Sequence, residues 1–225
     1  MAILADTQKI FADAHARTGG KIIIGFSGGK DSLVILDMAV RMFDVVKAYF
    51  LYLIPHLECV EVELERARKR WGIEIRQYPH PSMRVEIANG IYTSEWFGYE
   101  SLPEWKLKDV YAFAIKDFGI NCVATGAKAA DSGWRKRFMS TAYFESVINP
   151  IAKWHKYDVI SYLRSHDIPL PPSSGKSATG IGLSTPGLLW LHDTFPQDFK
   201  RLLKVFPFAQ AVIARRDMYG VTEEI

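Results

Sequence analysis

The chain has 225 residues, 48% of them hydrophobic and 24% charged, a composition that is typical of globular proteins and excludes disordered and fibrous ones. Its 28 basic against 25 acidic residues give a net charge of +3, too small for a protein that binds nucleic acid over its whole surface. Two cysteines cannot form a four-cysteine zinc or iron–sulfur site, and no apolar run reaches the roughly 18–20 residues of a membrane helix, so we expect a cytoplasmic protein without a membrane partner.

Strands and helices are predicted to alternate along most of the chain. Short apolar, β-branched runs predict strands at 21–26, 45–54, 73–78, 121–125 and 147–151. Apolar residues at helical spacing predict helices after the first strand, from about 57 to Gly72, from the capping-box pair Ser101 and Glu104 to Gly119, and over 156–165. This order indicates an α/β fold with an open, mostly parallel five-stranded sheet and helices on both faces.

Three parts follow one another in the predicted domain organisation. Residues 1–167 form the α/β domain. Residues 168–187 are rich in Pro, Gly and Ser, which predicts a long loop or lid. Residues 188–225 carry apolar residues in helical phase and are predicted to form a small helical C-terminal appendage.

The segment Ser27-Gly28-Gly29-Lys30-Asp31-Ser32 lies between a predicted buried strand and the start of a helix. Backbone N–H groups and the helix dipole make an anion site at such a place, and adjacent glycines let the backbone approach phosphate oxygens. The two serines supply hydroxyl donors, Lys30 supplies a positive charge, and Asp31 can orient Mg²⁺. Because an Asp stands where a Walker A loop has its metal-binding Ser or Thr, the segment predicts a different kind of di- or triphosphate site.

A second group of charged residues follows Thr125 and Gly126, at the end of the predicted strand 121–125. Its basic members are Lys128, Arg135, Lys136 and Arg137. Loops that follow neighbouring parallel strands face one another across the sheet edge, so this group would lie opposite the glycine-rich segment. Asp131 within it either holds a cationic side chain or helps to bind Mg²⁺.

Together these segments resemble the PP-loop ATP pyrophosphatases and, within them, the phosphoadenosine phosphosulfate (PAPS) reductase family. The resemblance rests on SGGKDS at 27–32, TGAKAADSGWR at 125–135 and NPIAKW at 149–154, and it spans about residues 21–172. Lys128 and Asp131 replace the Arg and Glu of the family's second block, so the bidentate fork of an arginine is lost there. The resemblance implies an adenine nucleotide alpha hydrolase-like fold for 1–167, with the nucleotide at the carboxyl edge of the sheet.

The resemblance also implies roles for single residues. The phosphates of ATP would be held by Ser27, Gly28, Gly29, Lys30, Asp31, Ser32, Thr125, Gly126 and Asp131. The catalytic residues would be Lys30, Asp31, Lys128 and Arg135. Lys30 would neutralise pyrophosphate, while Lys128 and Arg135 would clamp the acceptor or the α-phosphate. Mg²⁺ would accompany ATP with Asp31 as its ligand, and no zinc or iron–sulfur site is expected.

We expect an enzyme that binds ATP or an adenylyl sulfate, cleaves at the α-phosphate, and transfers AMP to an anionic or carbonyl acceptor with release of pyrophosphate. The family's reductases attack sulfur with a C-terminal cysteine thiolate, whereas no cysteine follows Cys122, and both Cys59 and Cys122 lie in contexts typical of packed thiols. Two alternatives stay open: a PAPS or adenylyl-sulfate reductase that uses a partner's thiol, and a non-catalytic nucleotide-binding subunit of a nucleic-acid modification complex. A homodimer also stays open.

Overall fold

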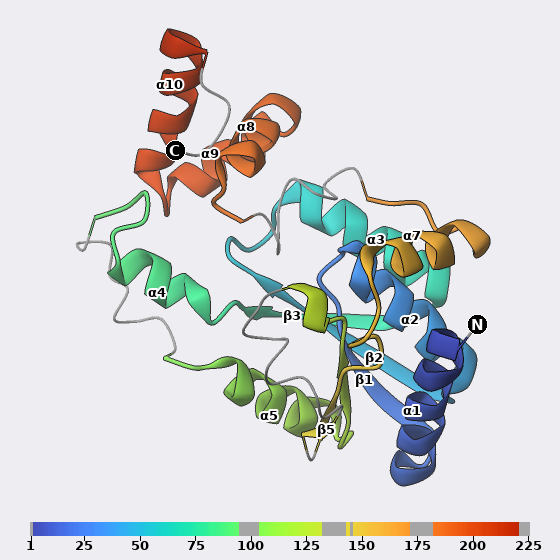
Figure 1. Cartoon of the computed structure of the whole chain (residues 1–225). Helices are drawn as coiled ribbons and strands as arrows, with labels where there is room; N and C mark the ends of the chain where they lie inside the picture. Colours follow the sequence, from blue (N-terminus) through green and yellow to red (C-terminus); the bar gives the residue numbers. More distant parts are fainter. Residues whose placement is uncertain (1, 95–103, 132–142, 145, 172–181, 221–225) are drawn as a thin grey trace.

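The computed structural model describes residues 2–94, 104–131, 143–144, 146–171 and 182–220, and Figure 1 shows their arrangement. The strands are β1 (Lys21–Gly25), β2 (Val45–Tyr52), β3 (Glu74–Pro79), β4 (Val123–Thr125), β5 (Tyr143–Phe144) and β6 (Val147–Ile148). Their order in the sheet is β3-β2-β1-β4-β6-β5. All neighbouring strands run parallel except β5, which pairs antiparallel with β6. The prediction of a mostly parallel sheet is confirmed, with β5 added at one edge.

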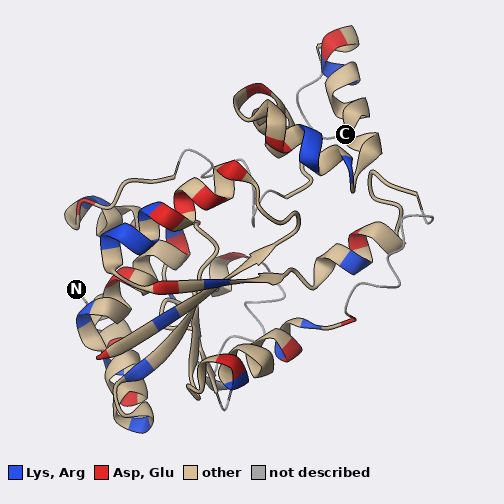
Figure 2. Cartoon of the chain, turned by 180° about the vertical axis from the view of Figure 1, so that it is seen from behind, with Lys and Arg blue, Asp and Glu red and all other residues tan. Residues whose placement is uncertain are grey.

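Helices cover both faces of the sheet, as predicted. They are α1 (Ala2–Thr18), α2 (Lys30–Met42), α3 (Glu58–Trp71), α4 (Ser82–Ala88), α5 (Leu107–Phe118) and α7 (Lys156–Ser165). Figure 1 shows α1, α2, α3 and α7 on one side of the sheet and α5 on the other. Acidic and basic residues are interspersed over these helices (Figure 2), in keeping with the small net charge.

Two helix ends agree with the sequence and one start does not. Gly72 and Gly119 end α3 and α5 in the left-handed conformation, at φ 64° and 66°, as their positions predict. The start of α5 near Ser101 and Glu104 is wrong, since the helix begins at Leu107, and Ser101 lies outside the described residues. There the Asp109 carboxylate accepts the Lys106 N–H at 2.8 Å, so the capping acceptor comes from Asp109.

Alternating side chains divide the core into two layers. Ile22 and Ile24 of β1 are fully buried among residues of α1, α2, α3 and α7. Ile23 points to the other face and packs with Val110 and Ala114 of α5. Successive side chains of a strand point to opposite faces of the sheet, so a strand that is buried on both faces has a continuous apolar sequence. The run KIIIG therefore forms the central strand because both of its faces are covered.

The connections of the sheet reverse direction between β1 and β4. From β1 the chain continues to β2 and β3 on one side, whereas β4 and β6 lie on the other side. In open parallel sheets, ligands bind outside the carboxyl ends of the strands at such a switch point. The glycine-rich segment follows β1, and Lys128 and Asp131 of the second charged group follow β4, so these described residues lie at this point.

The C-terminal segment consists of α8 (Thr185–Thr194), α9 (Pro196–Leu203) and α10 (Gln210–Tyr219), with a short 3₁₀ helix at Pro207–Ala209. These orange to red helices gather at one end of the molecule in Figure 1. Leu188, Leu202 and Phe206 are fully buried and belong to the same apolar cluster as α2 and α3. Of the predicted loop 168–187, residues 172–181 lie outside the described part. Among the helices that are described, none has both the length and the apolar character that crossing a bilayer requires.

Candidate functional site

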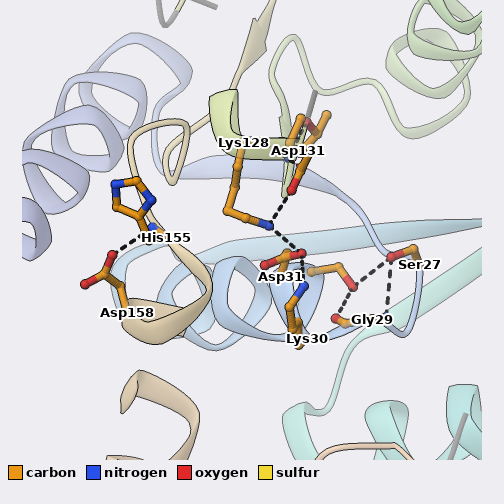
Figure 3. A network of polar contacts seen from close by, with 11 residues as sticks. Ser27, Gly29, Lys30, Asp31, Lys128, Asp131, His155 and Asp158 are labelled. Carbon is orange, nitrogen blue, oxygen red and sulfur yellow. Dashed lines mark hydrogen bonds and ion pairs between the residues drawn. The ribbon is translucent and has the colours of Figure 1, made fainter. Parts of the chain in front are cut away.

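The loop after β1 is shaped by glycines and by two serine hydroxyls. Gly28 has φ +71°, a conformation that residues with a Cβ rarely adopt. Ser27 Oγ accepts a hydrogen bond from the Gly29 N–H at 3.4 Å and donates one to Ser32 Oγ at 3.2 Å (Figure 3). Gly29 is the N-cap of α2, and no side chain caps the helix there. The first amides of α2 are therefore available to an anion.

Four charged residues meet at this helix start, two from the first turn of α2 and two from the segment that follows β4. Lys30 Nζ and Lys128 Nζ each lie 2.7 Å from the same Asp31 oxygen, Oδ2. Lys128 Nζ also lies 3.0 Å from Asp131 Oδ1. Figure 3 shows that Lys128 and Asp131 approach Asp31 from the segment that follows β4. The sequence left two roles open for Asp131, and in this structure it pairs with a cationic side chain, that of Lys128.

The two lysines differ in accessibility. The Lys30 side chain is 27% exposed, whereas that of Lys128 is only 2% exposed. A buried ammonium needs paired charge around it, and Asp31 and Asp131 provide that charge. Lys30 is therefore the more accessible cation for a ligand that arrives from solvent, whereas Lys128 is buried against the carboxylates of Asp31 and Asp131.

One oxygen of this cluster has no partner among the described residues. Asp31 Oδ1 is buried and accepts no hydrogen bond from them, and Lys128 Nζ makes its two contacts as ion pairs without the direction of a hydrogen bond. Buried polar atoms in native proteins are nearly always satisfied, and an orphaned one costs about 1–3 kcal/mol. The cluster is thus incompletely paired at the place where a ligand is predicted.

The orphaned oxygen also tests the predicted magnesium ion. No group of three or more His, Cys, Asp or Glu side chains that could hold a metal occurs among the described residues. Mg²⁺ usually takes only one or two carboxylates and completes its shell with substrate phosphates and water. Asp31 Oδ1, an acceptor without a donor, fits that mode of binding.

Gly126 brings the loop after β4 directly onto the first turn of α2. A Cβ at this position would lie 3.0 Å from both the Asp31 carbonyl carbon and the Ser32 nitrogen. Such contacts are tighter than side chains normally make, and the neighbouring atoms are backbone, which does not move easily. The absence of a side chain at Gly126 is therefore what allows Lys128 to reach Asp31.

Asn149 is a residue of this site whose role the sequence did not predict. It follows β6 directly and is 8% exposed. Its Oδ1 accepts a hydrogen bond from Thr125 Oγ1 at 2.6 Å, and Thr125 Oγ1 accepts the Ala127 N–H at 3.3 Å. The polar residue at the end of β6 thereby fixes the loop that carries Lys128. It lies inside the strand predicted at 147–151 and opens the block NPIAKW at 149–154, and that block was the available signal.

The structure places the predicted phosphate-binding residues at the switch point, but it does not test their roles. They lie in the loop after β1 and the first turn of α2 or at the end of β4 and in the segment that follows it: Ser27, Gly28, Gly29, Lys30, Asp31, Ser32, Thr125, Gly126 and Asp131. Arg135, together with Lys136 and Arg137, lies outside the described residues.

Both cysteine thiols are buried. Cys59 is 7% exposed and Cys122 is 2% exposed. Burial raises the pKa of both thiols, and for Cys59 the neighbouring Asp198 carboxylate raises the pKa further. Only the thiolate is a nucleophile, so neither cysteine has the environment of a reactive thiol.

The comparisons with known proteins identify the family. Residues 21–183 match the model of the phosphoadenosine phosphosulfate reductase domain. The chain belongs to this family. A phosphoadenosine 5′-phosphosulfate reductase of Gloeobacter violaceus is similar to it, with 24% identity over 189 residues that cover 79% of this chain and 75% of the relative. The family predicted from the three sequence blocks is confirmed.

Two solved structures are similar to this family member. The NH₃-dependent NAD synthetase of Campylobacter jejuni matches with a TM-score of 0.52 and 14% identity, covering 100% of this chain and 99% of that chain. The PAPS reductase of Candida auris matches with a TM-score of 0.49 and 18% identity, over 73% of this chain and 81% of that chain. The first of these likenesses shows that the fold is the expected adenine nucleotide alpha hydrolase-like one.

Proposed function

We propose that this chain is an enzyme that binds ATP at the switch point and cleaves it between the α- and β-phosphates, transferring AMP to an anionic or carbonyl acceptor. The observation that carries the proposal is the incompletely paired cluster of Lys30, Asp31 and Lys128 beside uncapped amides of α2. Donors, two ammonium groups and an unsatisfied carboxylate oxygen together suit a polyphosphate with its cation.

The residues would act mainly by positioning and neutralising charge. The amides of α2 and Lys30 would bind the β- and γ-phosphates, because Lys30 is the more accessible of the two lysines. Negative charge grows on pyrophosphate as it leaves, and fixed donors at that position stabilise the transition state. Lys128 would meet a phosphate oxygen only by exchanging its contact with Asp31. Arg135 remains the second proposed clamp.

The proposed reaction balances without a redox partner. An acceptor oxygen attacks the α-phosphorus, the bond from that phosphorus to the oxygen that bridges the α- and β-phosphates breaks, and pyrophosphate leaves with the electron pair. Asp31 is the residue that would hold Mg²⁺, which supplies further neutralisation of the phosphates when it is bound. The chain's own task is to keep phosphates, acceptor and donors aligned.

A second candidate is favoured by the family and by the Gloeobacter relative, which is named as a PAPS reductase. In that reaction two thiols reduce PAPS to sulfite and adenosine bisphosphate, and a disulfide forms. Cys59 and Cys122 are buried with raised pKa values, so a partner protein would have to supply the attacking thiolate.

Product analysis separates these functions. The chain is incubated with Mg²⁺ and ATP labelled at the α-phosphate and, separately, with sulfur-labelled PAPS and reduced thioredoxin; a Lys30→Ala variant serves as the control. Labelled AMP or an adenylated product that depends on Lys30 supports the proposal, and labelled ADP as the sole product contradicts it. Labelled sulfite supports the second candidate. Binding of ATP without turnover in either mixture would favour the nucleotide-binding subunit.

A further inference from the structure

The loop 53–57 between β2 and α3 lies at the same edge of the sheet as the phosphate-binding loop. β2 is the parallel neighbour of β1, with Gly25 in register with Tyr49, so the loops after both strands leave the sheet side by side. The loop reads Leu-Ile-Pro-His-Leu and contains no lysine or arginine. Contacts from this loop would therefore reach the uncharged part of a nucleotide, while Lys30 and α2 serve its phosphates.

His56 within this loop has a strained backbone. Its φ of +58° lies in the left-handed region, which costs a residue with a side chain about 1–2 kcal/mol. Such strain persists only where surrounding contacts impose it, and it is frequent at functional sites. The question is therefore which contacts hold His56 in place.

Two residues of α9 hold the loop and the start of α3. Arg201 Nη1 donates to the His56 carbonyl at 2.8 Å and to Asp198 Oδ1 at 3.1 Å. Asp198 is 1% exposed, and its two oxygens accept the N–H groups of Glu58 and Cys59 at 2.9 Å each. Leu57 is the N-cap residue of α3 and has no side-chain acceptor, so Asp198 supplies the cap from a distant part of the chain.

We propose that Asp198 and Arg201 are positioning residues that set the loop 53–57 for the nucleotide, which makes the C-terminal helical segment part of the nucleotide site. The proposal rests on the proposed function. The family match ends at residue 183, so α9 lies beyond the matched region. Arg201 contacts the loop at the His56 carbonyl, and Asp198 holds the first amides of α3, directly after the loop. Their effect is therefore expected on the nucleoside end of the ligand.

Cys59 provides a readout that is independent of the nucleotide. Its thiol is buried beside Asp198, and both burial and that carboxylate raise its pKa. If the contact between α9 and α3 opens, the thiol becomes accessible to a labelling reagent. Mass spectrometry of the labelled chain separates modification of Cys59 from that of Cys122.

The test uses Asp198→Asn and Arg201→Gln, with Asp193→Asn as the matched control. In Asp198→Asn, either orientation of the introduced amide places its NH₂ group against an N–H donor, because both oxygens of Asp198 are acceptors. Asp193 is 54% exposed and pairs with Arg216 within the C-terminal segment, away from the loop. Calorimetry gives the dissociation constants for ATP and for inorganic pyrophosphate, and labelling gives the rate at Cys59.

We expect Asp198→Asn to weaken ATP binding by about tenfold and to leave pyrophosphate binding within about twofold, with Cys59 labelled about tenfold faster. Arg201→Gln, which changes a half-exposed side chain, should act in the same direction more weakly. Equal losses of affinity for ATP and for pyrophosphate would overturn the inference but not the proposed function. An unchanged ATP affinity in a variant whose Cys59 is labelled faster would do the same. A wild-type chain that binds neither ligand would overturn the proposed function first.

Discussion

Asp31 and Asp37 lie on the same helix, α2, and have opposite surroundings. Asp37 accepts four hydrogen bonds, from Arg41 Nε and Nη2, Trp71 Nε1 and Tyr162 Oη, at 2.9, 3.3, 3.1 and 2.9 Å. Within the described part of the chain, Asp31 receives two lysines on one oxygen and no donor on the other. A fully satisfied buried carboxylate ties elements together, whereas a partly satisfied one at a sheet edge retains capacity for a ligand.

The pKa of Asp37 reflects its surroundings. Burial alone would raise it, but hydrogen bonds from Arg41, Trp71 and Tyr162 outweigh the burial and leave the pKa below its ordinary value. These three partners come from α2, α3 and α7, so Asp37 joins the helices of one face. The role of Asp37 is therefore structural. Changing Asp37 and Asp31 to Asn, one at a time, should distinguish a carboxylate that stabilises the fold from one that serves the reaction.

Asp37→Asn should cause the largest loss of stability. Donors face both oxygens of Asp37, so one of them would meet the NH₂ group of the amide. Breaking a buried charged network costs about 3–5 kcal/mol. Denaturant unfolding measures this loss, while ATP affinity of the folded fraction should stay unchanged. An unfolding free energy within about 1 kcal/mol of the wild type would remove the contrast between the two aspartates.

Asp31→Asn should mainly affect the reaction. The amide oxygen still accepts both lysines, and the NH₂ group replaces the oxygen that has no donor among the described residues. Asp131 still supplies the charge beside the buried Lys128, and Lys30 is partly exposed, so we expect the unfolding free energy to change by about 1 kcal/mol or less. Release of labelled AMP from ATP should fall by about 100- to 1,000-fold, the usual result of removing one preorganised charge contact. Full turnover in this variant would mean that Asp31 is structural.

Gly126→Ala should have an intermediate effect. Its Cβ would lie 3.0 Å from the backbone of Asp31 and Ser32, so the loop that carries Lys128 must shift by a few tenths of an ångström. Small misplacements of reacting groups are expensive, and we expect about a tenfold loss of AMP release. The thermal midpoint checks that folding is retained. An equal loss of stability and no loss of turnover would show that the contact matters for packing alone.

Tyr162→Phe should have the smallest effect, about 1 kcal/mol of unfolding free energy, because one hydrogen bond to Asp37 is lost. The effect should depend on pH. A lowered pKa means that the contribution of Asp37 is fully present above about 3.9, its unfolded value, and is lost as the pH falls through the folded value. Denaturant unfolding at a series of pH values should therefore show a smaller acid loss in the variant. If the pH dependence of the unfolding free energy is the same in the variant and the wild type, other carboxylates cause the loss of stability in acid.

The structure of the glycine-rich segment after β1 could be predicted because its signals are local. Strand, glycines and helix start follow one another within 21–42, and the residue types alone indicate an anion. The contact of Lys128 with Asp31 could not be predicted, since it depends on how closely β4 approaches α2 through Gly126. Asp198 was equally hidden: it caps α3 from a helix 140 residues further along the chain, and no spacing rule connects the two.

The start of α5 shows a limit of sequence-based prediction. Ser101 and Glu104 have the capping spacing, yet a cap also requires that the following turn packs on the core, and the buried stripe of α5 begins only at Val110. Tertiary packing therefore decided where α5 begins. Helix α1 carries apolar residues at helical spacing, Ile3, Leu4, Ile10, Phe11 and Ala14, so its local signal was present in the sequence although the prediction did not use it.

The most direct test of the central claim is thermal unfolding of the wild type and of Asp31→Asn, each with and without ATP and Mg²⁺. A ligand at about 100 times its dissociation constant stabilises the folded state by about 2.7 kcal/mol, or roughly 5–10 °C for a chain of this size. We predict this rise for the wild type, a similar midpoint for the unliganded variant, and a rise below about 2 °C for the liganded variant. Equal rises in both proteins, or a variant that melts far below the wild type without nucleotide, would contradict the account.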